Sequence, residues 1–230
     1  MKILAIADEE DVRLWDYFDR DYLKDVDLIL SAGDLKQSYL EFLVTMTNCP
    51  LLYVPGNHDN AYQTNPPEGC TCIDGKLFTF NGLRILGLGG SMRYKPGPYM
   101  YNETEMSLRI IKMQPAIVMK NGFDILLAHS PVRNYGDLND LPHVGYVCFD
   151  RLLNQWKPHM MIHGHVHKQY GHFTAEREHP SGARLINACG HMILDIPDNL
   201  RSHRLKAGPA VRGLTSYLAK GIKEPGRSGH

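Results

Sequence analysis

The sequence predicts an α/β protein in which helices cover a parallel or mixed β-sheet. Short apolar runs alternate along the chain with stretches whose apolar residues recur at helical spacing, beginning as β-α-β-α-β. The 230 residues suffice for one large α/β domain or two small ones. A hydrophobic fraction of 43% and a charged fraction of 22% are ordinary for a globular protein, which argues against disorder of the whole chain.

The N-terminal part of the chain carries three expected strands and two expected helices. Val12, Trp15, Phe18 and Tyr22 are spaced as on one face of a helix, which predicts a helix over 11–23. Short buried-type runs predict the strands, and a second helical spacing follows the second of them. The strands are expected over 3–7, 26–30 and 51–54, and the second helix over 39–46.

The second half of the chain continues this alternation. Asn81-Gly82 predicts a two-residue hairpin turn between flanking strands. Asn102 is the expected N-cap of the helix that follows a long loop rich in Gly, Pro and Tyr over 89–101. The remaining expected elements are strands over 77–80, 83–88, 123–128 and 159–162, helices over 103–113 and 147–156, and a closing antiparallel group over 168–174, 183–187 and 192–196.

The charge is distributed unevenly although the formal net charge is zero. Residues 198–230 carry about +5, which leaves about −5 on the rest of the chain. We therefore divide the chain into a domain over 1–197 and a basic, weakly ordered tail over 198–230. We favour a solvated extension over a nucleic-acid-binding arm for this tail, and an acidic body suits a protein that gathers carboxylates around cations.

The cysteines and the N-terminus indicate the compartment. Five cysteines at irregular spacing are typical of reduced thiols in a reducing environment. The N-terminus becomes acidic too early for a signal peptide, and no apolar run approaches the roughly 18 residues that span a bilayer. We expect a soluble, cytoplasmic protein without a membrane partner; its oligomeric state is left open.

Five short polar segments each follow an expected strand. Strands that lie side by side deliver such segments to one edge of a sheet, where α/β proteins bind their ligands. This convergence carries the functional prediction. The segments are Asp8-Glu9-Glu10, Gly33-Asp34, Gly56-Asn57-His58-Asp59, His129-Ser130-Pro131 and Gly164-His165-Val166-His167.

The residue types in these segments favour metal ions. Asp, Glu, Asn and His supply mixed oxygen and nitrogen ligands, and the absence of cysteine from the set disfavours a structural zinc site. Mixed donors suit Mn²⁺, Fe²⁺ or Zn²⁺ in catalysis. About seven candidate ligands exceed what one catalytic ion takes from a protein, so two ions are expected, as in enzymes that displace a phosphoryl group.

The five motifs in this order resemble the calcineurin-like metallophosphoesterase family over roughly 1–197. The resemblance implies a four-layer α/β/β/α sandwich of two mixed β-sheets. It implies hydrolysis of a phosphomonoester or phosphodiester by a hydroxide that bridges two metal ions, with a small phosphorylated molecule as substrate. The metal-ligand set that it implies is Asp8, Glu10, Asp34, Asn57, His129, His165 and His167.

The same resemblance assigns roles within the site. Asp34 would bridge the ions, one ion being held also by Asp8, the residue at position 10 and His167. The other would be held by Asn57, His129 and His165. His58 would stabilise the transition state or protonate the leaving oxygen. Asp59 would belong to the site without contacting the ions, in a role that the resemblance does not fix.

Position 10 departs from the family pattern. The family usually has His there, and this chain has Glu10. A carboxylate can bind in that position and adds a negative charge, which should favour Mn²⁺ over Zn²⁺, with Fe²⁺ and Mg²⁺ as alternatives. The other interpretation is that Glu10 points away and the first ion is weakly held.

Some residues outside the motifs are weaker candidates. Arg93 and Tyr94 in the long loop, and His143 after the His129 segment, could contact the substrate phosphate. Ordinary surface positions are the competing interpretation for all three. His163 is expected inside a strand and His191 is expected to be structural.

Two other functions stay open. The first is a nuclease of the same family, which the modest length and the acidic body disfavour. The second is a non-catalytic interaction scaffold on this fold, which the presence of His58 disfavours. Nucleic acid is therefore an alternative partner that we do not favour.

Overall fold

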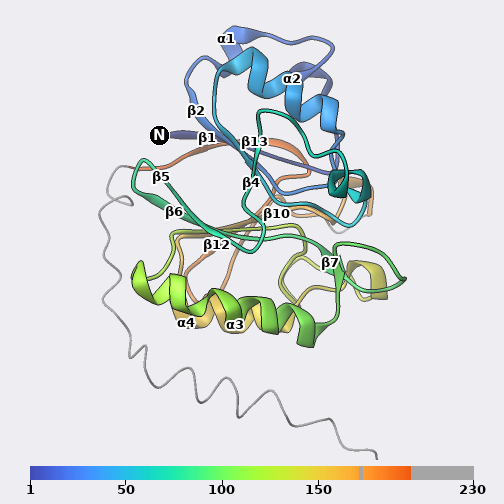
Figure 1. The fold of residues 1–230 in the computed structure, drawn as a ribbon, viewed down its shortest axis with the longest axis vertical. Coiled ribbons are helices and arrows are strands. Elements are labelled where there is room, and N and C mark those ends of the chain that lie inside the picture. The colour runs from blue at the N-terminus through green and yellow to red at the C-terminus, as the bar shows by residue number, and fades with distance from the viewer. Residues whose placement is uncertain (171–172, 198–230) are drawn as a thin grey trace, which may run out of the picture.

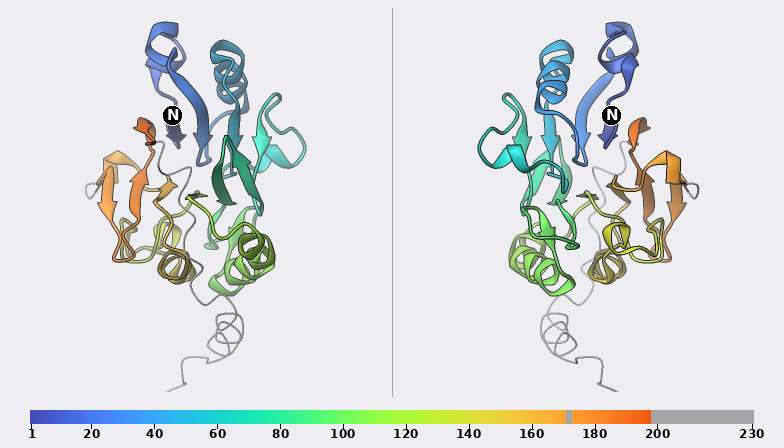
Figure 2. Two further views of the ribbon diagram at one scale, coloured as in Figure 1. Left: turned by 90° about the vertical axis from the view of Figure 1, so that its left-hand side faces the viewer. Right: turned by 90° about the vertical axis from the view of Figure 1, so that its right-hand side faces the viewer.

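Two β-sheets lie face to face at the centre of the molecule, and helices cover the outer face of each (Figures 1 and 2). The computed structural model describes residues 1–170 and 173–197. One sheet has the strand order β13-β1-β2-β3-β4 and the other has the order β11-β12-β10-β9-β6-β5. This is the expected α/β/β/α sandwich of two mixed sheets. The tail expected over 198–230 lies outside the described residues.

The first sheet is built from the expected N-terminal strands. Neighbouring strands are parallel from β1 to β4, and β13 pairs antiparallel with β1. The parallel pairing brings the carboxyl ends of β1, β2 and β3 to one edge. The strands are β1 (Lys2–Ala7), β2 (Val26–Ser31), β3 (Leu51–Tyr53), β4 (Thr71–Cys72) and β13 (Gly190–Asp195).

The second sheet has a parallel centre and antiparallel edges. Strands β6, β9, β10 and β12 are parallel, whereas β5 and β11 pair antiparallel at the two edges. Asn81 and Gly82 have φ angles of 45° and 86°, as a type I′ hairpin turn requires. The strands are β5 (Leu77–Phe80), β6 (Leu83–Leu88), β9 (Ile125–Ala128), β10 (Met160–His163), β11 (Glu176–Glu178) and β12 (Arg184–Asn187).

The helices form the outer layers. The helix α2 (Gln37–Thr47) and the short α1 (Arg20–Leu23) pack on the first sheet, and α3 (Glu103–Met119) and α4 (Val147–Trp156) pack on the second. Asn102 caps α3 as expected, in a reciprocal capping box with Glu105. The 89–101 loop contains a small parallel pair, β7 (Ser91–Met92) with β8 (Met100–Tyr101).

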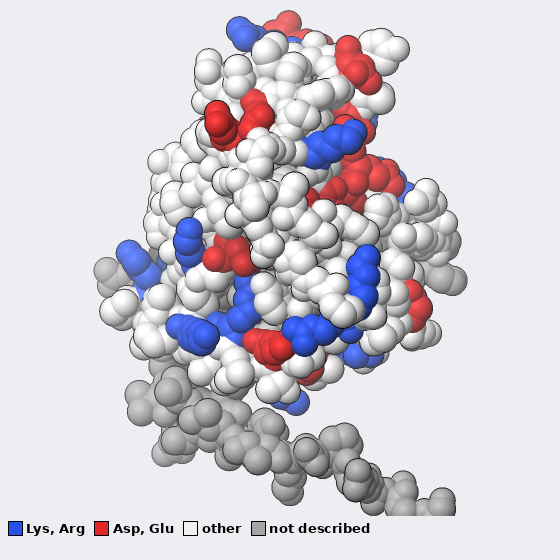
Figure 3. Space-filling model, turned by 45° about the vertical axis from the view of Figure 1, so that its right-hand side comes forward, with Lys and Arg blue, Asp and Glu red and all other residues white. Residues whose placement is uncertain are grey.

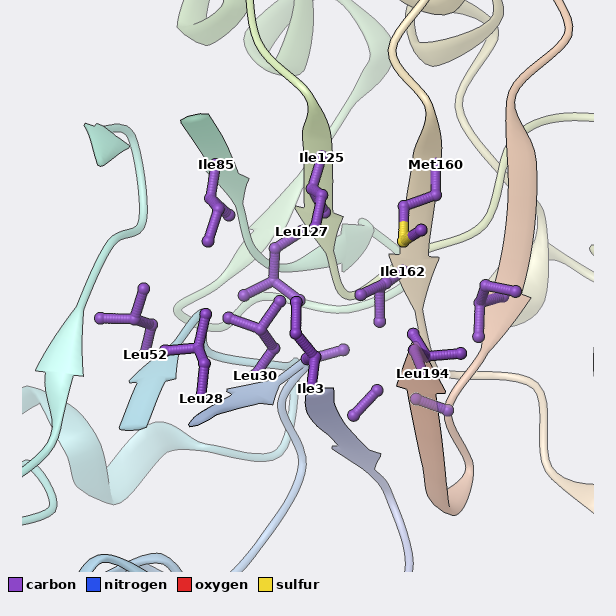
Figure 4. Packing of buried hydrophobic residues seen from close by; sticks show 14 of the residues in the cluster. Ile3, Leu28, Leu30, Leu52, Ile85, Ile125, Leu127, Met160, Ile162 and Leu194 are labelled. Atoms are coloured by element: carbon purple, nitrogen blue, oxygen red, sulfur yellow. The ribbon is translucent and has the colours of Figure 1, made fainter. Parts of the chain in front are cut away.

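The central core fills the space between the two sheets. Figure 4 shows side chains of both sheets pointing toward one another across this space. Ile3, Leu28 and Leu30 come from the first sheet, and Ile125 and Ile162 from the second; all five are at most 1% exposed. Because these strands are buried on both faces, they are continuous apolar runs in the sequence, which is why they could be predicted.

The helix expected over 11–23 is wrong. The structure has a 3-10 turn, η1 (Val12–Leu14), and the separate short helix α1. The carboxylate of Asp11 accepts the N–H of Arg13, and that of Asp19 accepts the N–H of Asp21, so each begins its own short helix.

The expected closing group has strands near two of its three ranges, 183–187 and 192–196, but its pairing as one antiparallel group is wrong. Residues 168–170 form the 3-10 turn η4 (Lys168–Tyr170), and 171–172 lie outside the described residues. Strands β12 and β13 belong to different sheets, and β12 runs parallel to β10. The two residues between them, Ala188 and Cys189, carry the chain from one sheet to the other.

The strand β13 returns the chain to its start. The amino group of Met1 donates to the Ile196 carbonyl at 3.1 Å, and the Ile196 N–H donates to the Met1 carbonyl at 2.8 Å. This corner lies at the opposite end of β1 from Asp8. No helix among the described residues is long and apolar enough to cross a membrane.

Candidate metal centre

The expected polar segments meet at one edge of the sandwich. Asp8 follows β1, Asp34 comes shortly after β2, and Asn57 lies beyond β3 in the first sheet. His129 directly follows β9, and His165 comes after β10 in the second sheet. The site therefore lies where the carboxyl ends of parallel strands of both sheets come together.

Three side-chain atoms that can bind a metal ion lie close to a fourth, His129 Nε2. The Nε2 atom of His129 lies 3.0 Å from Asn57 Oδ1, 3.1 Å from His165 Nδ1 and 3.3 Å from Asp34 Oδ2. One ring nitrogen carries at most one proton, so it cannot satisfy three such neighbours by donating. A shared cation satisfies all four atoms at once, and the residue set therefore fits a divalent metal ion.

His129 and His165 are each oriented by the ring nitrogen that faces away from this cluster. His129 Nδ1 lies 2.8 Å from the Ala32 carbonyl, and His165 Nε2 lies 2.7 Å from the Pro142 carbonyl. A carbonyl only accepts, so each of these nitrogens carries a proton and donates it. The inner nitrogens, His129 Nε2 and His165 Nδ1, are then the ones available to bind a metal.

The charges at this point favour a cation. Burial opposes protonation of His129, but the charges of Asp34 and Asp8 outweigh it and raise the pKa of His129 to about 9. Burial and the charge of His129 lower the pKa of His165 to about 3. Burial and repulsion by Asp34 raise the pKa of Asp8 to about 7, although the positive charge of His129 opposes that rise. The negative charge at this point thus holds a proton on His129, and it opposes ionisation of Asp8 when no cation is bound.

Three of these residues have strained backbones. Asp8, Asp34 and His165 have φ angles of 61°, 58° and 72°, in the left-handed region that residues other than glycine seldom adopt. Such conformations cost about 1–3 kcal/mol each and persist where surrounding contacts impose them. Both carboxylate oxygens of Asp8 accept the His165 N–H, at 3.0 and 2.8 Å, so two of the strained residues hold each other.

Two glycines allow this close approach. A Cβ atom at Gly56 would collide with the carboxylate of Asp34 and the ring of His129. A Cβ atom at Gly164 would collide with the carboxylate of Asp8 and the side chain of Ala7. The glycines in the two predicted motifs therefore provide room for the ligand side chains.

A model of the family described as calcineurin-like phosphoesterase matches residues 1–169. The chain belongs to this family. The chain is also similar to a probable cyclic nucleotide phosphodiesterase of Pseudoalteromonas sp. (strain SM9913), with 26% identity over 156 residues that cover 63% of this chain and 57% of that relative. The match thus spans little more than half the length of that relative.

Two solved structures share the fold of this chain. The protein TT1561 of Thermus thermophilus superposes with a TM-score of 0.59 at 16% identity, covering 91% of this chain and 98% of its own. A second solved structure superposes with a TM-score of 0.60 at 14% identity, covering 84% of this chain and 94% of its own. At these identities the similarity concerns the fold alone.

A second group of ligand-type side chains lies beside the first. Glu9, His167 and Cys189 each offer one donor atom, and these three atoms lie within 4.8 Å of one another. Burial and the charges of Asp8 and Glu9 raise the pKa of the Cys189 thiol to about 12. Of the three, only His167 is among the residues predicted from the sequence as ligands. Cys189 comes two residues after the expected strand over 183–187, and that position was the signal available for it.

Glu10 has a different neighbour. Its Oε2 atom lies 3.3 Å from the ammonium group of Lys36, and the ammonium is largely exposed. Such a pair contributes on the order of 0–1 kcal/mol and is easily broken. Glu10 still lines the same pocket as Asp8, so its assignment as a ligand stays a prediction.

An open pocket of about 790 Å³ is lined in part by Asp8, Glu9 and Asp34 of these groups. Figure 3 shows acidic side chains gathered on the right-hand side of the molecule, with a basic side chain beside them. His58 is exposed and lies in the pocket wall, and its own N–H donates to Asp34 Oδ1 at 2.7 Å. The polar residues lining the pocket are Asp8, Glu9, Glu10, Asp34, Lys36, Gln37, His58 and Asp59.

The weaker candidates divide into two groups. His143 lies in the turn η3 (Leu141–His143), and its ring centroid is 5.2 Å from that of His165, at the edge of the site. Arg93 is instead held by the Met100 carbonyl and the Glu105 carboxylate, and Lys95 lies over the ring of Tyr94. His163 is buried at the end of β10, as expected, and it is not part of the converging set.

Proposed function

We propose that this calcineurin-like phosphoesterase is a dinuclear metal-dependent enzyme that hydrolyses a small phosphomonoester or phosphodiester. The observation that carries the proposal is the convergence of Asp34, Asn57, His129 and His165, from four strand ends, on one point. These four would hold one ion, with Asp34 shared between the two. Asp8 and His167 would hold the second ion, together with a residue of the Glu9-Glu10 pair.

Two bound divalent ions supply Lewis acidity toward the phosphoryl oxygens and a hydroxide nucleophile at neutral pH. The protein would hold the metal-binding side chains in place and supply the proton for the leaving oxygen. His129 and His165 are held by carbonyls, so their rings cannot turn toward solvent. The exposed ring of His58 would meet the ester and protonate the leaving oxygen.

The name of the bacterial relative suggests which esters to test first. That relative is a probable cyclic nucleotide phosphodiesterase, so cyclic nucleotides belong in the substrate panel with chromogenic monoesters and diesters. Full-length protein would be freed of metal, reloaded separately with Mn²⁺, Fe²⁺, Zn²⁺ and Mg²⁺, and assayed against each ester, with bound metal measured in parallel.

We expect turnover of at least one small ester with close to two ions bound. His58→Ala should lower kcat about 10²–10⁴-fold with bound metal unchanged, whereas Asn60→Ala, at the next exposed position along the chain, should not lower it. Stoichiometric metal without turnover of any ester would favour the interaction scaffold. Cleavage of DNA ends without turnover of small esters would favour the nuclease.

A further inference from the structure

The crossover between the sheets places Cys189 at the metal edge. Strand β13 begins at Gly190, whose partner on β1 is Ala7, so the residue before β13 lies beside the residues that end β1. Cys189 also forms an isolated bridge with Ala7, the residue before Asp8. The position of the thiol next to the site is therefore a consequence of the topology.

Asn187 fixes Cys189 relative to the histidine segment. Its Nδ2 donates to the Val166 carbonyl at 2.8 Å, and its Oδ1 accepts the Cys189 N–H at 3.0 Å. Asn187 is only 4% exposed, so both bonds are shielded from water. Val166 lies between His165 and His167, and one amide thus ties Cys189 to both of them.

The surroundings of Cys189 differ from those of the other buried cysteines. Cys49 and Cys148 both pack within apolar clusters, as buried thiols ordinarily do. Cys189 is 2% exposed and belongs to none of the three apolar clusters. Its neighbours are instead ligand-type groups, with the Glu9 carboxylate 3.4 Å from His167 Nδ1.

We propose that Cys189, Glu9 and His167 together bind one of the two divalent ions. On binding, the Cys189 S–H bond breaks, its proton passes to solvent, and the sulfur bonds to the metal. A thiolate is a soft ligand that favours Zn²⁺ or Fe²⁺ over Mn²⁺. The composition of this site therefore opposes the Mn²⁺ preference that Glu10 alone would predict. This inference rests on the proposed dinuclear function for the presence of the ion, but its test needs no substrate.

Cobalt reports thiolate coordination directly. Metal-free, full-length protein would be titrated with Co²⁺ while the near-ultraviolet absorption that marks a sulfur–cobalt bond is recorded. We expect this absorption in the wild type and in Cys49→Ser, a matched control at a buried thiol of an apolar cluster. We expect its loss in Cys189→Ser, a near-isosteric change, with the fold checked by circular dichroism.

A measurement on the wild type covers the case in which Cys189→Ser does not fold. X-ray absorption at the zinc edge of the Zn²⁺-loaded wild type should show a sulfur ligand at about 2.3 Å. A zinc spectrum with nitrogen and oxygen ligands alone, or an unchanged cobalt spectrum in Cys189→Ser, would overturn the inference. Turnover with Mn²⁺ but no thiolate signal would overturn only this inference, whereas a thiolate signal without turnover would overturn only the proposed function.

Discussion

The carboxylate of Asp59 holds the backbone of Asp34. One oxygen, Oδ2, accepts the Asp34 N–H at 2.8 Å and the Gly56 N–H at 2.7 Å. Asp59 is 5% exposed, so these bonds are shielded from water. Burial and repulsion by Asp34 raise the pKa of Asp59 to about 6. The segments that follow β2 and β3 are thus joined at a single oxygen behind the site.

Removal of this carboxylate should loosen the site and the fold together. Asp59→Ala leaves two shielded N–H groups without an acceptor, which should lower the free energy of unfolding by about 2–4 kcal/mol. Because Asp34 is then less well held, metal affinity should fall about 10–100-fold. Urea unfolding and metal titration check both values. Asp59→Asn keeps an acceptor oxygen and should recover most of each loss; equal losses in both variants would contradict this explanation.

The glycine before His165 should be irreplaceable. Gly164→Ala places a methyl group against the carboxylate of Asp8, so Asp8 must move from its bonds to the His165 N–H. Overpacking of this kind costs about 1–3 kcal/mol, and we expect metal binding to be lost in addition. The matched control is Gly97→Ala, where the nearest contact would be an ordinary 3.4 Å from Met100. Normal metal binding in Gly164→Ala would show that Asp8 can move without consequence.

Loss of a buried ion pair away from the site should lower the free energy of unfolding without changing metal binding. Arg84 donates to both oxygens of Asp124, at 2.9 and 2.5 Å, between β6 and β9, and the Asp124 side chain is 1% exposed. Asp124→Ala leaves a largely buried guanidinium without its carboxylate, which should cost about 3–5 kcal/mol. Metal content at low denaturant should not change.

The comparison for that variant is an exposed pair in the same sheet. The side chains of Arg184 and Glu176 are 46% and 47% exposed. Glu176→Ala should therefore cost less than about 1 kcal/mol. Similar losses in the two variants, measured by urea unfolding, would mean that burial does not determine the strength of these pairs.

The acid sensitivity of the fold should include a contribution from Asp11. Burial opposes ionisation of Asp11, but hydrogen bonds from Arg13 and the nearby His191 outweigh it and lower the pKa of Asp11 to about 2. A carboxyl whose pKa is lowered in the folded state stabilises it above its ordinary pKa and loses that effect as the pH falls toward the folded value. The advantage of wild type over Asp11→Asn in free energy of unfolding should therefore shrink between about pH 4 and pH 2. A constant difference across that range would contradict the shift.

Strands were easier to predict from this sequence than helices. Runs such as Ile3-Leu4-Ala5-Ile6-Ala7 are buried on both faces, so their composition alone marks them. The segment over 11–23 has the periodicity of a helix, but Val12 and Tyr22 are 53% and 43% exposed. Capping by Asp11 and Asp19 outweighs that periodicity. The strand β11 consists of three exposed charged residues, so it offers no apolar pattern to detect.

The residues of the site could be predicted where side chains of ligand type come shortly after expected strands. Asp34, Asn57, His129 and His165 lie one to four residues after a strand, and their side chains lie together in the structure. Glu9 and Cys189 could not be ranked in advance. Which of two neighbouring glutamates faces His167 depends on the backbone after β1. The approach of Cys189 depends on a crossover between sheets that local sequence does not encode.

The pairing of Met1 with Ile196 has a practical consequence. The amino terminus lies at the start of β1, and Asp8 directly follows its end, so a strand of six residues, about 20 Å long, separates them. A fluorophore or a surface tether attached at the α-amino group would face away from the carboxylates. Immobilised protein could then exchange ions and esters freely, which suits it to flow measurements of metal uptake.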